Sequence, residues 1–275
     1  MQTDHVESPP NRWRTLAATV RWTRSSSILL SLFFTTIALI VVVWWPLTEE
    51  LLSYIDWQGK WWLSIDWLLI GIFVAMSSLI VAGADLRVDG LIILVGTFGG
   101  LVIESWGTQT LLWSYYTLER PPLWIIPAWP IASLSIDRIV RVLGLVVPSR
   151  QERWFRILYW MVFVAFMGWM VAFTRPTLAQ PMTVAALVLC TALIITPTDH
   201  RLAVLTFAAG SGLGYFLELW GTTRLCWTYY TQETPPLFAV LAHGMAAVAF
   251  WRAGLLMKPY YEAVWRRIAS RADAQ

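Results

Sequence analysis

One segment of the sequence occurs twice, 114 residues apart. The first copy begins at Glu104 with Glu-Ser-Trp-Gly-Thr, and the second begins at Glu218 with Glu-Leu-Trp-Gly-Thr. Between 104–123 and 218–237, 13 of the 20 aligned positions are identical without a gap. Shared hydrophobicity does not explain so many identities. The chain therefore contains a duplicated unit, and any proposed function has to explain why two copies of this segment are useful.

The composition sets the class of protein. Hydrophobic residues make up 57% of the sequence, charged residues only 13%, and there are 19 tryptophans. This balance lies far from that of a soluble domain and indicates an integral membrane protein. The two cysteines, Cys190 and Cys226, have no disulfide or zinc partner at a suitable spacing. We expect them to be free thiols.

Eight apolar stretches follow one another along the chain, and we interpret each as a transmembrane helix. The predicted fold is all-α, a polytopic membrane protein with eight transmembrane helices as two parallel four-helix repeats. The predicted spans are 28–47, 67–84, 91–106 and 123–147 in the first repeat, and 157–173, 182–196, 202–220 and 237–257 in the second. No small-residue cleavage site follows the first span, which indicates a retained signal anchor.

The basic residues predict the orientation. We divide the chain into an N-terminal arm (1–27), the first repeat (28–147), a basic linker (148–156), the second repeat (157–257) and an amphipathic tail (258–275). Arginine and lysine concentrate in the arm, the linker and the tail, so the positive-inside rule places both termini in the cytoplasm of a bacterial inner-membrane protein. Because each repeat has an even number of spans, a pseudo-two-fold axis along the membrane normal should relate the two repeats.

Glycines precede both repeated glutamates at intervals of four residues, as Gly96, Gly100 and Glu104 and as Gly210, Gly214 and Glu218. This spacing places all three residues on one helix face. Small residues on such a face let helices approach closely in lipid. We expect the two glycine faces to cross at the axis and to bring the carboxylates together beneath the aromatic loops, near the outer side.

Paired carboxylates in such a place predict acid–base chemistry. A charged, unpaired glutamate within a span costs about 2.5–3.5 kcal/mol, so it should face the protein interior. Two neighbouring carboxylates cannot both ionise easily, so one should hold a proton near neutral pH and serve as a general acid. Two alternatives stay open at this point. The pair could bind a proton or a metal cation in a transporter, or each glutamate could only accept hydrogen bonds that fix its loop.

The candidate catalytic residues are Glu104, Glu218 and His243. His243 stands where the first copy has Trp129, so one half carries a titratable group that the other lacks; a packed histidine is the alternative. The candidate substrate-binding residues come from the repeated segments and are Trp106, Thr108, Trp113, Tyr115, Tyr116 and Glu119, with Trp220, Thr222, Trp227, Tyr229, Tyr230 and Glu233. The aromatic members would also suit an interfacial belt.

Other charged residues have simpler explanations. Asp85 and Asp199 each precede an apolar stretch and are predicted to cap helices after short turns, the first over 85–90. Asp137 is predicted to form an ion pair with Arg138 and Arg141. The sequence has no phosphate-binding glycine loop, haem histidine pair, hydrolase triad, aspartate-rich prenyl-diphosphate motif or basic nucleic-acid surface. We expect no cofactor, no metal and no nucleic acid, but a partner in the lipid phase.

The repeated segment resembles a motif of the carotenoid-biosynthesis membrane proteins, the family of bacterioruberin-type hydratases and, more distantly, of heterodimeric lycopene cyclases. Glu104, Gly107, Thr110, Tyr116 and Pro127 occupy the places of that motif, as do Glu218, Gly221 and Tyr230 in the second copy. Leu-Trp replaces Phe-Gly before the tyrosines, and Arg224 replaces a threonine. The resemblance covers about thirty residues in each half. It implies acid-catalysed hydration or cyclisation of a polyene, with the carboxylates protonating the alkene.

Three functions remain open from the sequence. The chain could bind an apolar isoprenoid-like lipid and act on it as a hydratase, cyclase or isomerase. The parallel duplication would also suit a transporter of a small molecule or lipid. The tryptophan-rich surface would suit a non-catalytic subunit of a membrane complex, whose protein partner the sequence does not identify.

Overall fold

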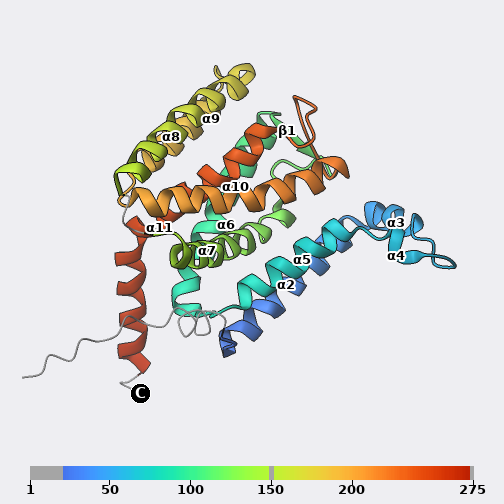
Figure 1. The fold of residues 1–275 in the computed structure, drawn as a ribbon, viewed down its shortest axis with the longest axis horizontal. Helices are drawn as coiled ribbons and strands as arrows, with labels where there is room; N and C mark the ends of the chain where they lie inside the picture. Colours follow the sequence, from blue (N-terminus) through green and yellow to red (C-terminus); the bar gives the residue numbers. More distant parts are fainter. Residues whose placement is uncertain (1–20, 149–151, 273–275) are drawn as a thin grey trace, which may run out of the picture.

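The computed structural model describes residues 21–148 and 152–272 and is almost entirely helical (Figure 1). The first part contains α2 (Arg24–Val43), α3 (Trp45–Ser53), α4 (Trp61–Ser64), α5 (Trp67–Val81), α6 (Leu86–Gln109), β1 (Trp113–Tyr115), η1 (Leu123–Ile125) and α7 (Ala128–Val146). The second contains α8 (Glu152–Thr174), η3 (Arg175–Thr177), α9 (Pro181–Ile194), α10 (His200–Thr223), β2 (Trp227–Tyr229) and α11 (Leu237–Ala272). Residues 1–20 of the predicted arm, 149–151 of the linker and 273–275 of the tail lie outside the described residues.

Within the described part of the chain, six helices are long and apolar enough to cross a membrane. They are α2, α6, α7 together with η1, α8, α10 and α11. Two further apolar helices, α5 and α9, are shorter, with 15 and 14 residues. The structure therefore confirms a helical, multi-pass membrane protein.

Local sequence signals explain where several helices begin. Asp85 caps α6 by accepting a hydrogen bond from the amide of Arg87, and Asp199 caps α10 by accepting one from Leu202. Both predicted caps are confirmed. The turn predicted over 85–90 is wrong beyond its first residue, because the capped helix starts at Leu86. Similarly, α2 ends before the predicted boundary, since Pro46 lies in the first turn of α3 and disfavours helix continuation through the preceding residues.

Four helices form the centre of the molecule. Helix α6 packs on α7 and α10 packs on α11, while α7 also contacts α10 and α11 contacts α6. The pair α2 and α5 lies on one side of this centre and the pair α8 and α9 on the other (Figure 1). Each outer pair contacts helices from both halves of the sequence, since α5 touches α7 and α10, and α9 touches α11 and α6.

The glycine faces do not meet at an axis, so that expectation is wrong. Each one packs on the helix that follows its own aromatic loop. A Cβ on Gly100 would lie 2.3 Å from the Trp129 ring, and one on Gly214 would lie 2.5 Å from Cβ of His243. The glycines therefore make room for the side chains at positions 129 and 243, which occupy the centre instead.

A two-stranded antiparallel sheet joins the two aromatic loops. Trp113 pairs with Tyr229 and Tyr115 pairs with Trp227. The amides of Tyr116 and Tyr230 extend the pairing to carbonyl oxygens of the opposite loop, at 3.0 and 3.1 Å. Each strand has only three residues, and its partner is more than a hundred residues away, so the sequence did not predict it. The sheet locks both repeated segments into one unit.

A buried ion-pair network connects α6 to α7. The guanidinium of Arg138 lies 2.7 Å from Asp89 and 2.6 Å from Asp137, and it also donates to the carbonyl of Ala82. Arg141 contacts Asp137 at 2.8 Å. The predicted pairing of Asp137 is confirmed, whereas the participation of the fully buried Asp89 was not foreseen.

The tail continues from the last apolar stretch as part of α11, a single helix that contains Pro259. Its C-terminal part turns away from the four central helices (Figure 1). Proline removes a backbone donor and commonly bends a helix where it occurs.

Candidate functional site

Glu104 lies near the C-terminal end of α6, and its side chain is only 3% exposed. Three side chains donate hydrogen bonds to its carboxylate. The indole of Trp113 donates to Oε2 at 3.1 Å, while the hydroxyl of Tyr115 and the indole of Trp129 donate to Oε1 at 2.8 and 3.1 Å. Two of these donors come from the aromatic loop and the third from α7.

Glu218 has the same surroundings near the end of α10 and is 2% exposed. Trp227 donates to Oε2 at 2.9 Å, and the hydroxyl of Tyr229 donates to Oε1 at 2.8 Å. The third partner is Nε2 of His243, 2.8 Å from Oε1. An imidazole nitrogen can donate or accept a proton, whereas an indole can only donate. The second site therefore has a proton-exchanging partner that the first lacks.

The third partners of the two glutamates contact each other. The rings of Trp129 and His243 stack with their centres 5.9 Å apart and their planes 21° apart. The stack brings one partner of each carboxylate into contact with the other, and among the described residues no hydrogen bond joins the carboxylates directly. The glutamates therefore belong to one assembly of side chains, yet each keeps its own set of donors.

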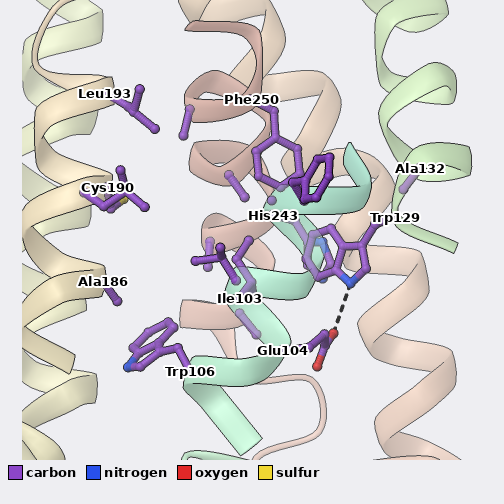
Figure 2. A pocket seen from close by; sticks show the side chains of 18 of the residues that line it. Ile103, Glu104, Trp106, Trp129, Ala132, Ala186, Cys190, Leu193, His243 and Phe250 are labelled. Carbon is purple, nitrogen blue, oxygen red and sulfur yellow. Dashed lines mark hydrogen bonds between the residues drawn. The ribbon is translucent and has the colours of Figure 1, made fainter. Parts of the chain in front are cut away.

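Both glutamates lie in the wall of one large cavity of about 680 Å³. Helices α6, α7, α9 and α11 supply most of its wall (Figure 2). From α9, Ala186, Cys190 and Leu193 point across the cavity towards α6 and α11. The stacked side chains of Trp129 and His243 lie deep on the opposite side.

Polar groups occupy one end of this cavity. The carboxylates, His243 and the hydroxyls of Tyr115 and Tyr229 gather near the aromatic loops. Further along α11 the wall consists of Ala246, Ala249, Phe250, Ala253, Leu256 and Met257. No lysine or arginine occurs among the lining residues. The cavity thus suits an apolar molecule, one end of which would lie beside the carboxylates.

Burial keeps the two loop phenols protonated. It raises the pKa of Tyr115 and of Tyr229 well above the ordinary value for tyrosine, and the neighbouring glutamates add to the increase. At neutral pH both hydroxyls therefore donate hydrogen bonds to their glutamates.

The predicted site residues divide into two groups. Those that line the cavity are Glu104, Trp106, Trp113, Tyr115, Glu218, Trp227, Tyr229 and His243. The others lie away from it. Thr108 and Thr222 are buried and donate to the backbone carbonyls of their glutamates at 2.6 and 2.5 Å, so they stabilise the helix ends. Glu119 and Glu233 are exposed on the loops.

Two aromatic candidates connect parts of the fold, and a third is exposed. Trp220 donates to Asp66 at 2.9 Å, and its ring stacks on Trp44. The hydroxyl of Tyr230 donates to the carbonyl of Phe173 at 2.8 Å, whereas Tyr116 is 43% exposed. None of the three is in the cavity wall.

Sequence reasoning missed two parts of the site. The sequence indicates Trp129 only as the counterpart of His243, although its indole donates a hydrogen bond to Glu104. The contribution of α9 also went unforeseen, because its residues are ordinary apolar side chains. The sequence signal for the long wall is the spacing of small residues along α11, at positions 239, 242, 246, 249 and 253, which places them on one helix face.

Among the described residues, no group of three or more histidine, cysteine, aspartate or glutamate side chains is placed to hold a metal ion. Cys190 and Cys226 are both free thiols. No protein-family description, curated protein or solved structure matches this chain.

Proposed function

We propose that the chain is an eight-span protein of a bacterial inner membrane, built as two four-helix repeats with the same orientation. In this arrangement the shorter helices α5 and α9 also cross the membrane. The bounds of α5, α6 and β1 recur 114 residues later in α9, α10 and β2, to within one residue, which supports the repeat. The basic arm, linker and tail then lie in the cytoplasm, and the carboxylates lie towards the outer side.

We further propose that the cavity binds an apolar isoprenoid-like lipid and that the protein acts on a polyene as a hydratase, cyclase or isomerase. One observation carries this proposal, namely two buried carboxylates in the wall of an otherwise apolar cavity of about 680 Å³. Burying an ionisable group within a membrane span costs free energy, so such a group is by default a candidate for a functional role. The resemblance of the repeated segments to the carotenoid-biosynthesis proteins points to the same chemistry.

The reaction begins with proton transfer from a carboxylic acid to one carbon of an alkene. The π bond breaks, a C–H bond forms, and the neighbouring carbon becomes a cation while the acid becomes a carboxylate. Addition of water gives an alcohol, attack by a second alkene closes a ring, and loss of a different proton moves the double bond. In each case one proton leaves the product and returns to a carboxylate, so the protein is regenerated.

The aromatic side chains suit the cationic intermediate. Trp113 lies 5.8 Å from Tyr229 and Trp227 lies 5.9 Å from Tyr115, measured between ring centres. All four rings line the cavity beside the carboxylates. The face of an aromatic ring attracts a cation by about 0.5–2 kcal/mol.

We assign the proton-donating role to Glu218 with His243. The 2.8 Å contact between Nε2 and Oε1 lets His243 return a proton to the carboxylate after each reaction. Glu104 has only indole and phenol donors. It is therefore suited to stabilising the cation as a carboxylate.

The first experiment identifies the lipid. The full chain is purified from its native membrane, and the bound lipids are extracted and identified by mass spectrometry. The protein is then incubated in D₂O with the recovered lipid, and with squalene as a defined polyene. We expect deuterium to enter the polyene with the wild-type protein and not with the Glu104→Gln/Glu218→Gln variant.

The outcome separates the competing functions. Deuterium incorporation that is equal in the wild type and in the double variant contradicts acid catalysis by these glutamates. Proton-coupled uptake of a solute into vesicles, without chemical change, would identify a transporter. Stability that depends on a second, co-purifying polypeptide would identify a subunit of a complex.

A further inference from the structure

The duplicated core has two equivalent grooves, and one of them is filled. On the side of α5, Ile72 and Met76 are each 6% exposed. They belong to one buried cluster with Ile131 of α7, and Leu213 and Leu217 of α10 pack against that cluster. Neither Ile72 nor Met76 lines the 680 Å³ cavity that holds the two glutamates in its wall.

The equivalent groove on the side of α9 is open. The same 114-residue shift relates Ile72 to Ala186 and Met76 to Cys190. Both of the smaller residues line the 680 Å³ cavity. Two polypeptide segments in equivalent positions thus differ in side-chain volume at the points that face the core.

The opposite wall differs in the same sense. In α7 the first half has Ser135 and Ile139, and the corresponding residues of α11 are Ala249 and Ala253. Both alanines line the cavity. Small residues therefore occur on both walls of the open groove.

The shape and charge of the open groove restrict its occupant. Its lining follows α11 from Ala239 to Met257, which corresponds to about 27 Å at 1.5 Å per residue. The wall holds two carboxylates and no lysine or arginine, so it disfavours a phosphate or carboxylate headgroup. An extended, uncharged apolar chain fits both properties.

We infer that the protein binds one extended apolar molecule beside its glutamates, on the α9 side only. The small side chains of Ala186 and Cys190 leave the groove open on that side, whereas Ile72 and Met76 fill the equivalent groove on the other side. The inference rests on the proposed function only in taking an apolar lipid as the occupant. A separate cavity of about 410 Å³ between α2, α6 and α7 has neither glutamate in its wall and is not part of this site.

The test exchanges the side chains between the two grooves. The full chain in detergent is incubated with squalene, and bound molecules are counted by native mass spectrometry. We expect one squalene per wild-type chain and loss of that mass in the Ala186→Ile/Cys190→Met variant. The reciprocal Ile72→Ala/Met76→Cys variant is the matched control and should retain at least one bound squalene. Squalene binding by Ala186→Ile/Cys190→Met at the wild-type level would overturn the inference.

A second variant covers the case in which the double substitution disturbs folding. Ala253→Ile introduces the side chain of the equivalent Ile139 into the end of the open groove that lies away from the glutamates. It should weaken binding of squalene more than binding of the shorter decane. Equal effects on the binding of the two ligands would contradict an open groove that extends along α11.

Further ligands separate this inference from the proposed function. Hexadecane and oleate are tested in the same way, as a neutral alkane and an anionic chain. Binding of hexadecane as tight as that of squalene supports the open groove but removes the support for an isoprenoid substrate. Binding of oleate as tight as that of squalene overturns the preference for an uncharged chain. If Ala186→Ile/Cys190→Met incorporates deuterium at the wild-type rate, that result would support the proposed chemistry and refute the open groove as the binding site.

Discussion

Trp129 and His243 occupy equivalent positions in the two halves, and their rings stack on each other with centres 5.9 Å apart. Each also binds the glutamate of its own half, at 3.1 and 2.8 Å. The pair therefore connects the two carboxylates and makes them chemically different, because an imidazole nitrogen can donate or accept a hydrogen bond whereas an indole can only donate.

Replacing His243 by tryptophan tests this difference. Gly214 lies under His243 as Gly100 lies under Trp129, so the helix beneath position 243 has the same small residue as the helix beneath Trp129. We expect the His243→Trp variant to fold and to bind squalene. Its deuterium incorporation should fall by about 10²–10⁴-fold, the usual contribution of a general acid–base group. Unchanged incorporation by His243→Trp would exclude the imidazole from proton transfer.

Removing a carboxylate should also destabilise the fold. In Glu104→Leu the donors of Trp113, Tyr115 and Trp129 lose their acceptor, and each unsatisfied buried donor costs about 1–3 kcal/mol. Glu104→Gln keeps an acceptor oxygen and should be less destabilised. The temperature of unfolding in detergent measures the difference. A Leu variant as stable as the Gln variant would show that these hydrogen bonds contribute little.

The glycine beside each loop tryptophan should not tolerate a side chain. A Cβ on Gly221 would lie 2.0 Å from the Trp227 ring, so Gly221→Ala must displace the indole that donates to Glu218. We expect a destabilisation of about 1–3 kcal/mol, as for other overpacked sites. Gly212→Ala, on the same helix with nothing within 4 Å of its Cβ, should be neutral or slightly stabilising. Equal unfolding temperatures for the two variants would contradict the packing described above.

The two halves offer a matched test of the buried ion pair. Arg138 is 1% exposed and contacts Asp89 and Asp137. In Arg138→Met the buried Asp89 loses its close partner and keeps Arg141 at 4.0 Å, and breaking a buried ion pair typically costs about 3–5 kcal/mol. Arg252, at the equivalent position in the second half, has a single side-chain partner within the described part of the chain, the Thr196 hydroxyl at 3.3 Å. Arg252→Met should therefore have a small effect on thermal unfolding. Similar decreases in unfolding temperature for the two variants would argue against a special role for the ion pair between Arg138 and Asp89.

Cys226 should resist alkylation in the folded protein. Burial raises the pKa of its thiol to about 12, and only the thiolate reacts. The thiol is then almost wholly protonated at pH 8. The rate of its labelling by iodoacetamide should rise about tenfold with each unit of increase in pH until the pH reaches that pKa. Mass spectrometry of the labelled peptide measures the rate, with the denatured chain as a control. Rapid labelling of the folded protein at pH 8 would show that the loop opens.

The sequence by itself determined the class of protein and most of the residues that surround the two glutamates. Long apolar stretches in the described chain predict helices that can cross a membrane, because the bilayer interior requires internally satisfied backbone hydrogen bonds. The repeat identified Glu104 and Glu218 and the loop aromatics that surround them. Asp85 and Asp199 were readable as caps because capping depends on residues close together in the sequence.

Only the tertiary structure decided how these parts meet. Pairing of Trp113 with Tyr229, packing of the glycines on positions 129 and 243, and the approach of α9 to the glutamate site all join residues far apart in the chain. Periodicity assigns residues to a helix face but does not say which helix that face will contact. The open groove likewise depends on the small volume of Ala186 and Cys190 at a place where Ile72 and Met76 fill the other half. The difference in side-chain volume opens a groove only when the two halves are packed around the same core.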